Sequence, residues 1–181
     1  MRLRRGLAFL ELEETVTNLS DKPESFSWGH HIVLGGDFLE DGCRLDLPAR
    51  TIKTPAEQYE PATARLAPGQ NEPWPLARGR NPGEVIDLTH IPGPQIHSHD
   101  DVFLTDIDQG VLQVENPRLK LRFWLDWNAA LFGCVVNWQP YGGSDMPPLT
   151  GIYGVGIEPW VTCLGLTEAI EQGKALTLPP G

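Results

Sequence analysis

The sequence is poor in basic residues. Lys and Arg together number 14 against 24 Asp and Glu, which gives a formal net charge of −10. Nucleic acids and anionic membrane surfaces bind proteins through cationic faces, so this balance argues against both as partners. The one basic cluster, MRLRRG at residues 1–6, is too short to reverse the balance.

Cysteine is also scarce, and long apolar runs are missing. The three cysteines, Cys43, Cys134 and Cys163, are too few and too scattered for a disulfide framework, and their odd number favours a reducing compartment. No apolar run approaches the roughly 20 residues that span a bilayer. The N-terminus also lacks the continuous apolar segment of a signal peptide. We therefore expect a cytoplasmic protein.

Glycine and proline, in contrast, are abundant. The 181 residues include 19 Gly and 17 Pro, which favours many turns over long helices within a single domain. In LKLRFWLDW (119–127) the side chains alternate with period two, the pattern of a half-buried strand. One short helix is predicted over 166–173 near the C-terminus. Further strands are predicted over 8–18, 26–34, 84–88, 102–106, 110–115, 132–138 and 151–158. These elements predict an all-β, antiparallel fold of two packed sheets, a β-sandwich.

The segment 61–96 interrupts the strand pattern. It holds seven prolines and few apolar residues. A loop of that length inside a compact domain is usually a functional lid or poorly ordered, so we expect a long irregular excursion here.

Four short stretches contain residues that could carry chemistry. They are Trp28-Gly29-His30-His31, His97-Ser98-His99-Asp100-Asp101, Asn137-Trp138-Gln139 and Glu158-Pro159-Trp160. Neighbouring residues of a strand point to opposite faces, so at most one of His30 and His31 serves a given site. His97 and His99 have the spacing to share one face of a strand, which suits a metal ion. Glu158 ends the apolar run GIYGVGIEPW (151–160), either as a solvated strand end or as a carboxylate held in a cleft.

The order of these stretches resembles a known family. TVTNLSDKPESFSWGHHIVLGG, then HDDVFLTD, then NWQPYGG, then YGVGIEPW is similar to the sugar mutarotases of the aldose 1-epimerase (galactose mutarotase-like) superfamily. The resemblance implies the supersandwich fold of that family. The family's domain is longer than this chain, so we expect residues 1–181 to form a single partial domain, its central and C-terminal part. Unpaired sheet edges would then favour a homodimer that pairs them.

The resemblance also implies roles for individual residues. Glu158 falls on the family's catalytic base, and His31 falls on its general acid, with His30 as an alternative one residue away. Asp100, three residues before Phe103, falls on the aspartate that binds sugar hydroxyls. Further sugar contacts are expected from Gln139 and Trp138.

These residue types suit the exchange of α and β anomers of an aldose or an aldose derivative. One group removes the proton of the anomeric hydroxyl and another protonates the ring oxygen, so that the ring opens and recloses without cofactor or metal. A non-catalytic carbohydrate-binding module on the same fold is the first alternative. The second is a metal-binding jelly roll that uses His97, His99 and one histidine of the 30–31 pair.

Overall fold

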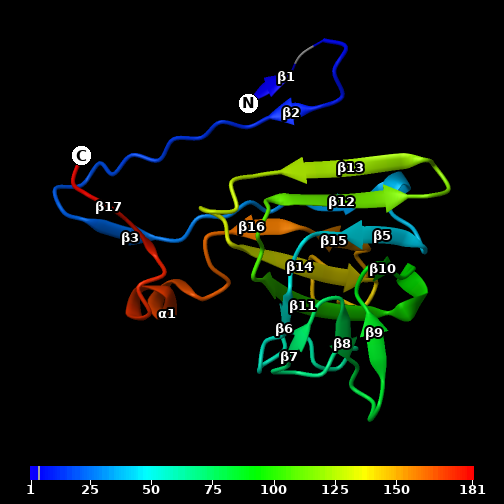
Figure 1. Cartoon of the computed structure of the whole chain (residues 1–181). Helices are drawn as coiled ribbons and strands as arrows, with labels where there is room; N and C mark the ends of the chain where they lie inside the picture. The colour runs from blue at the N-terminus through cyan, green and yellow to red at the C-terminus, as the bar shows by residue number, and fades with distance from the viewer. Residues whose placement is uncertain (4) are drawn as a thin grey trace.

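The computed structural model describes residues 1–3 and 5–181. Antiparallel strands form two main sheets, one of five strands and one of four (Figure 1). The five-stranded sheet has the order β16 (Glu158–Trp160), β14 (Cys134–Tyr141), β11 (Ser98–Thr105), β6 (Thr51–Lys53) and β7 (Asn71–Pro73). The four-stranded sheet has the order β10 (His90–Ile91), β5 (Cys43–Asp46), β12 (Val111–Asn116) and β13 (Leu121–Asp126).

Four two-stranded pairs complete the β-structure. They are β1 (Arg2–Leu3) with β2 (Leu10–Glu11), β4 (Val33–Gly35) with β15 (Gly154–Gly156), β3 (Glu24–Phe26) with β17 (Leu176–Leu178), and β8 (Leu76–Arg78) with β9 (Val85–Asp87). Within the described ranges there is one α-helix, α1 (Leu166–Glu171), where the sequence predicts a helix over 166–173. The predicted all-β, antiparallel sandwich with one short helix is therefore confirmed.

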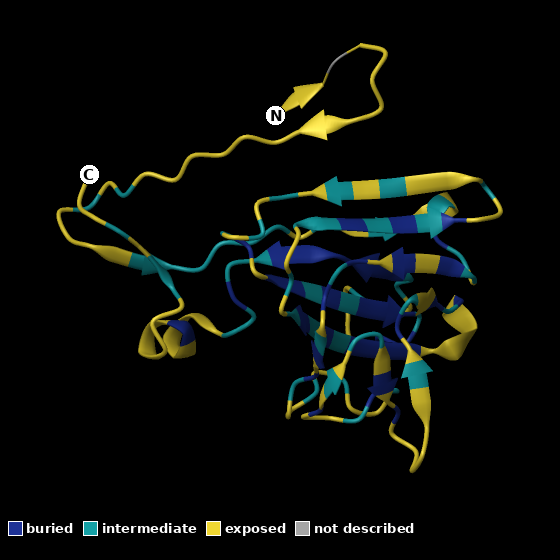
Figure 2. Cartoon of the chain, viewed as in Figure 1, coloured by how far each residue is buried: buried dark blue, intermediate teal, exposed yellow. Residues whose placement is uncertain are grey.

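The hydrophobic core lies between the two main sheets. Val102 and Leu104 of β11 and Ile52 of β6 contribute to one buried cluster with Leu45 of β5 and Val114 of β12. Figure 2 shows buried positions in the strands of both main sheets. Because side chains alternate along a strand, every second residue of the five-stranded sheet points into this core. The residues between them point to the other side of the sheet, which we call the outer face.

The segment 61–96 differs from the irregular excursion that the sequence predicts. It contains β7 to β10 and a short 3-10 helix, η2 (Pro94–Ile96). Several of its apolar side chains reach the core, namely Leu66, Ala77, Leu88 and Ile91. Pro73 is the last residue of β7, and Pro75 lies in the turn before β8. These prolines end short strands, and the apolar residues between the turns can still pack into the core.

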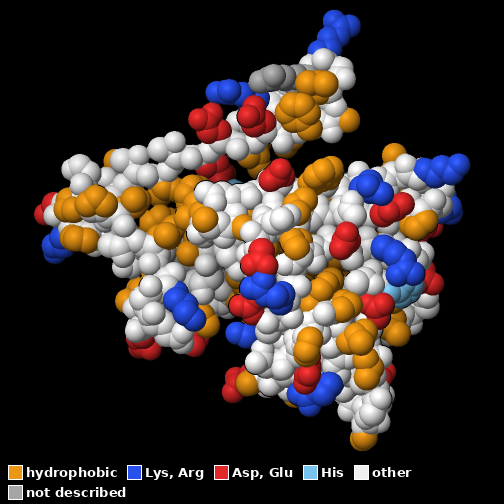
Figure 3. Space-filling model, in the orientation of Figure 1, with side chains coloured by type: hydrophobic (Ala, Val, Ile, Leu, Met, Phe, Trp, Pro, Cys, Tyr) orange, Lys and Arg blue, Asp and Glu red, His pale blue; other side chains and the backbone are white. Residues whose placement is uncertain are grey.

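Residues 1–3 and 5–14 belong to an N-terminal arm that stands away from the sheets (Figure 1). The strand predicted over 8–18 is only Leu10–Glu11 here, and it pairs with β1. Two open grooves of about 470 and 870 Å³ lie between the arm and β13. Apolar side chains are exposed on the arm and on the body facing it (Figure 3). The described part of the chain includes no helix long and apolar enough to cross a membrane.

The cysteines also differ from the sequence-based expectation, in which their scatter and odd number favoured a reducing compartment, where disulfides are rare. Cys134 and Cys163 form a disulfide with a Cα–Cα distance of 6.0 Å, while Cys43 is free and buried. The pairing follows from the sheet: Cys134 lies opposite Trp160 of β16, and Cys163 follows that strand by three residues.

Candidate functional site

His31 and Glu158 lie opposite each other on adjacent antiparallel segments. Gly29 pairs with Trp160 and Val33 pairs with Gly156, so the register between them places His31 across from Glu158. The Nδ1 atom of His31 is 2.6 Å from Oε1 of Glu158. Directly opposed residues of an antiparallel pair share one face of the sheet, so the contact follows from the backbone pairing. The resemblance places the acid and the base at these two residues.

Burial shapes the acidity of Glu158. Its side chain is 7% exposed, whereas that of His31 is 62% exposed. Burial raises the pKa of Glu158, and the charge of His31 and hydrogen bonds from Trp160 and His31 oppose this effect. The indole Nε1 of Trp160 donates to Oε2 of Glu158 over 3.3 Å. A carboxyl group with a raised pKa is better matched to proton exchange near neutral pH than an exposed one.

Two glycines make room for this arrangement. A side chain at Gly29 would overlap the indole of Trp160, which lies directly on the glycine backbone. A Cβ atom at Gly156 would be 2.6 Å from Oε1 of Glu158 and 2.9 Å from Cβ of Trp138. Both positions therefore need glycine for the aromatic rings and the carboxylate to come together.

Trp138 and Asp101 extend the site along the outer face. Val136 lies opposite Glu158, and Trp138, two residues further along β14, lies opposite Asp101. All four side chains therefore share the outer face. The rings of Trp138 and His31 are 5.6 Å apart between centroids. We call His31, Glu158, Trp138 and Asp101 the outer-face site.

Asp101 is a half-buried carboxylate in this site. Burial raises its pKa, while His99 lowers it and Asp100 raises it further. Within residues 1–3 and 5–181, no side chain or backbone N–H donates a hydrogen bond to its carboxylate. A carboxylate in this position can accept hydrogen bonds from the hydroxyl groups of a ligand.

His30, the alternative to His31, lies on the other side of its segment. Its Nε2 atom is 3.4 Å from Oε2 of Glu14. Its ring packs against Trp28 and Phe132, with centroid distances of 6.5 and 5.2 Å. His30 thus lines the smaller groove beneath the N-terminal arm and does not join Glu158.

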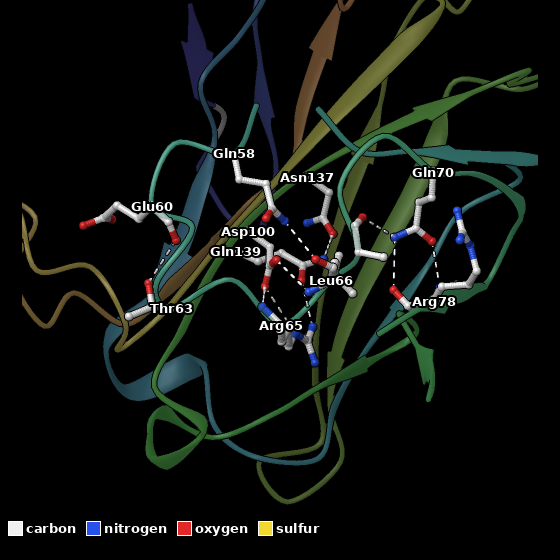
Figure 4. A network of polar contacts seen from close by, with 11 residues as sticks. Gln58, Glu60, Thr63, Arg65, Leu66, Gln70, Arg78, Asp100, Asn137 and Gln139 are labelled. Atoms are coloured by element: carbon white, nitrogen blue, oxygen red, sulfur yellow. Dashed lines mark hydrogen bonds and ion pairs between the residues drawn. The ribbon is translucent and has the colours of Figure 1, made fainter. Parts of the chain in front are cut away.

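Asp100 and Gln139 do not lie in the outer-face site, contrary to the placement that the resemblance implies. Asp100 is on the core side of β11 and accepts hydrogen bonds from the backbone N–H groups of Arg65 and Leu66, at 3.2 and 3.0 Å (Figure 4). Arg65 donates to Oε1 of Gln139 over 2.8 Å, and Gln139 donates to Asn137 over 2.6 Å. The physical reason is strand alternation, which sends Asp100 to the side of Val102 and Leu104.

This buried network leaves little capacity for a ligand. Asp100 is 4% exposed and Gln139 is 1% exposed. Burial raises the pKa of Asp100, and the two backbone N–H groups and the Arg65 charge oppose it. The guanidinium of Arg65 also lies over the ring of Tyr141, 5.2 Å from its centroid. Asp100 therefore fastens the segment around Arg65 to the sheet.

The two histidines of the metal-binding alternative do not share a strand face. His97 is exposed, has a φ of 50°, and precedes β11, which begins at Ser98. His99 is buried and uses both ring nitrogens, Nδ1 with Glu60 and Nε2 with the indole N–H of Trp138. Residues 1–3 and 5–181 contain no group of three or more His, Cys, Asp or Glu arranged to hold a metal ion.

The sequence reasoning missed Asp101 and Glu60 as parts of this region. Asp101 could have been found from the strand alternation, had the start of β11 been known, because it is two residues from Phe103 on the outer face. Glu60 lies in a turn-rich segment and has no local sequence signal; only the tertiary fold brings it to His99.

No protein-family model matches the sequence, and no curated protein matches it either. Two solved structures do share the fold. A putative aldose 1-epimerase from Klebsiella pneumoniae subsp. pneumoniae MGH 78578 matches with a TM-score of 0.59 and 17% sequence identity, covering 91% of this chain and 37% of its own. The Slr1438 protein from Synechocystis sp. PCC 6803 matches with a TM-score of 0.56 and 19% identity, covering 90% and 43%. The chain spans less than half the length of either structure, and the similarity shows a mutarotase-like β-sandwich fold.

Proposed function

We propose that the chain is a sugar mutarotase-like protein that exchanges the α and β anomers of an aldose or an aldose derivative. The observation that carries the proposal is the pairing of His31 with Glu158 on a sheet face that also bears Trp138 and Asp101. An imidazole and a carboxylate side by side can provide an acid and a base to one small molecule. The fold shared with an aldose 1-epimerase-like structure supports the same reading.

In the proposed reaction, the Glu158 carboxylate removes the proton from the anomeric hydroxyl while protonated His31 delivers a proton to the ring oxygen. The bond between C1 and the ring oxygen breaks, and C1 becomes an aldehyde. After rotation about the bond from C1 to C2, the reverse proton transfers close the ring on the other face. The proton count is restored at the end of each cycle, so no cofactor or metal takes part.

The other two residues of the outer-face site would hold the sugar. Trp138 offers an apolar ring face against which a sugar ring can stack. Asp101, rather than Asp100, has a carboxylate free to accept hydrogen bonds from sugar hydroxyls. The sugar must also separate His31 from Glu158, which touch at 2.6 Å. His31 can move because its side chain is largely exposed.

Polarimetry tests this proposal. The rate of optical rotation change of fresh α-glucose and α-galactose is measured with the protein and with Glu158→Gln and His31→Gln. We expect the protein to change the optical rotation faster than buffer alone. In both variants the rate above that of buffer should fall about 10²-fold or more. Glu168→Gln, on the exposed helix α1, is the matched control and should keep full activity. If the unmodified protein shows only the rate of buffer alone with every aldose of a broad panel, the catalytic proposal is disproved.

A non-catalytic carbohydrate-binding module is the second candidate. The observation that favours it is the closed contact between His31 and Glu158, which leaves no space for a sugar between acid and base. Calorimetry with the same sugars distinguishes the two. Binding that depends on Trp138 and Asp101, without any change in the rate of mutarotation, would support the module; absence of binding would exclude both.

A further inference from the structure

We propose that Glu60 and His99 are positioning residues that fix the indole of Trp138, against which the ring of His31 packs in the outer-face site. This inference rests on the proposed function, because it assigns these two residues to the same sugar site. Neither residue takes part in the acid–base chemistry. This positioning role explains the buried histidine of the His-x-His stretch, His99, without metal binding.

His99 is the centre of the arrangement. It lies on the outer face of β11, two residues before Asp101, and is 4% exposed. The indole Nε1 of Trp138 donates to Nε2 of His99 over 2.6 Å. On the other side of the imidazole, Nδ1 contacts Oε2 of Glu60. Both polar atoms of the ring therefore have a partner in the folded chain.

The direction of the protons follows from the donor chemistry. An indole nitrogen can only donate, so Nε2 of His99 must present a lone pair to Trp138. The imidazole then carries its proton on Nδ1 and donates it to the carboxylate of Glu60. Trp138, His99 and Glu60 thus form a chain of two hydrogen bonds that runs in one direction and ends on a carboxylate. Hydrogen bonds to an ionised acceptor are stronger than neutral ones.

Glu60 is itself held in place. Its side chain is 8% exposed, and its Oε1 atom accepts a hydrogen bond from the backbone N–H of Asp145 over 2.9 Å. Burial acts to raise the pKa of Glu60, but the hydrogen bonds from His99 and Asp145 outweigh it and the pKa is lowered. The carboxylate points away from the Asp100 network (Figure 4). Its backbone carbonyl is also bonded, by the Thr63 hydroxyl.

Fixing Trp138 matters because His31 has few other contacts. The His31 side chain is 62% exposed, and its ring touches only Glu158 and the Trp138 ring among the contacts described above. An indole that is held at its Nε1 edge can turn about its side-chain bonds only by breaking that hydrogen bond. It therefore offers a fixed wall to His31 and a fixed apolar face to a sugar, and fixed geometry lowers the ordering cost of binding.

The experiment begins with the protein free of sugar. Proton–nitrogen NMR identifies the indole N–H of Trp138 by its loss in Trp138→Phe, and its hydrogen exchange is measured in His99→Ala, His99→Gln and Glu60→Gln. We expect exchange about tenfold faster in His99→Ala, as for the loss of one buried hydrogen bond. His99→Gln should restore slow exchange, because its amide oxygen can accept from the indole and its amide nitrogen can donate to Glu60. Unchanged exchange in both His99→Ala and Glu60→Gln would overturn the inference.

The second arm measures the site with α-glucose or α-galactose, whichever the unmodified protein converts. We expect KM to rise about tenfold in His99→Ala, a larger effect than that on kcat, with recovery in His99→Gln. If hydrogen exchange of the Trp138 indole changes while KM and kcat do not, the two residues only stabilise the fold, and the positioning role is overturned. If no sugar is converted or bound by any form, the proposed function fails while the exchange result still reports on the hydrogen-bond chain.

Discussion

Asp100 and Asp101 are consecutive residues of β11 whose carboxylates lie on opposite sides of the five-stranded sheet. Asp100 binds the backbone N–H groups of Arg65 and Leu66 on the core side, and Asp101 lies across from Trp138 on the outer face. One aspartate therefore belongs to the framework and the other to the site, although the two are neighbours in the chain.

Replacing each aspartate with asparagine should distinguish the structural role of Asp100 from the ligand-binding role proposed for Asp101. Asp100→Asn removes a buried charge partner of Arg65 and turns an amide NH2 group toward one of the two backbone donors, Arg65 N–H or Leu66 N–H. We expect it to lower the free energy of unfolding by about 3 kcal/mol. Asp101→Asn should leave stability unchanged or slightly raised, because burial disfavours its charged form, while weakening sugar binding. Urea unfolding and calorimetry check both. A stable Asp100→Asn that fails to bind sugar would place Asp100 in the site after all.

The raised pKa of Glu158 predicts a pH-dependent stability. The folded chain binds a proton at Glu158 more tightly than the unfolded chain does, because burial raises the pKa of this carboxyl. The free energy of unfolding that this group contributes is therefore full below its ordinary pKa and falls as the pH rises through the raised value.

Glu158→Gln should consequently melt higher than the unmodified protein at pH 8, by about 2–4 °C, and show no advantage at pH 4. Thermal melts followed by circular dichroism over this range provide the measurement. A variant that melts lower at pH 8 would mean that the pairing with His31 outweighs the cost of burial.

Gly29 should tolerate no side chain. In Gly29→Ala the added methyl group would overlap the Trp160 indole, so the indole must shift and weaken its hydrogen bond to Glu158. We expect a loss of about 1–3 kcal/mol in the free energy of unfolding, typical of overpacking. Gly165→Ala is the matched control, since this glycine has a φ of −60° and open space around it. Equal stability of the two variants would contradict the packing described for Trp160.

The disulfide can be tested by counting thiols. In denaturant without reductant, one thiol per chain should react, that of Cys43, and three should react after reduction. Cys163→Ser should lower the free energy of unfolding of the oxidised protein by about 3–4 kcal/mol, because the link closes a loop of 29 residues in the unfolded chain. Reductant should not destabilise this variant further. Three reactive thiols before reduction would show that Cys134 and Cys163 are not linked.

Local patterns in the sequence predicted those elements whose environment is also local. The alternation in 119–127 corresponds to β13, and the capped stretch 166–173 corresponds to α1. The alternation over 8–18 produced only the two residues of β2, because within residues 1–3 and 5–181 it pairs with β1 of the same arm and with no other strand. A period-two pattern indicates an extended segment but does not supply the neighbouring strand that makes it a sheet.

The site was harder to predict because it depends on register between distant segments. The sequence suggested His31 and Glu158 as a pair, and the fold brings them into contact. The resemblance placed Asp100 in the site and missed Asp101, because the start of β11 at Ser98 is formed by buried polar residues that look like a loop. Those polar residues are buried only because Arg65, Leu66 and Glu60 reach them from the segment between β6 and β11.

The alternation along β11 and β14 has a consequence for how such a protein can diversify. Asp100, Asn137 and Gln139 lie on the core side and form hydrogen bonds within the fold. The positions between them lie on the outer face, where the proposed ligand would bind. Under the proposed function, substitutions at His99, Asp101 or Trp138 would change the sugar-binding face and leave in place the core-side residues that hold the strands together.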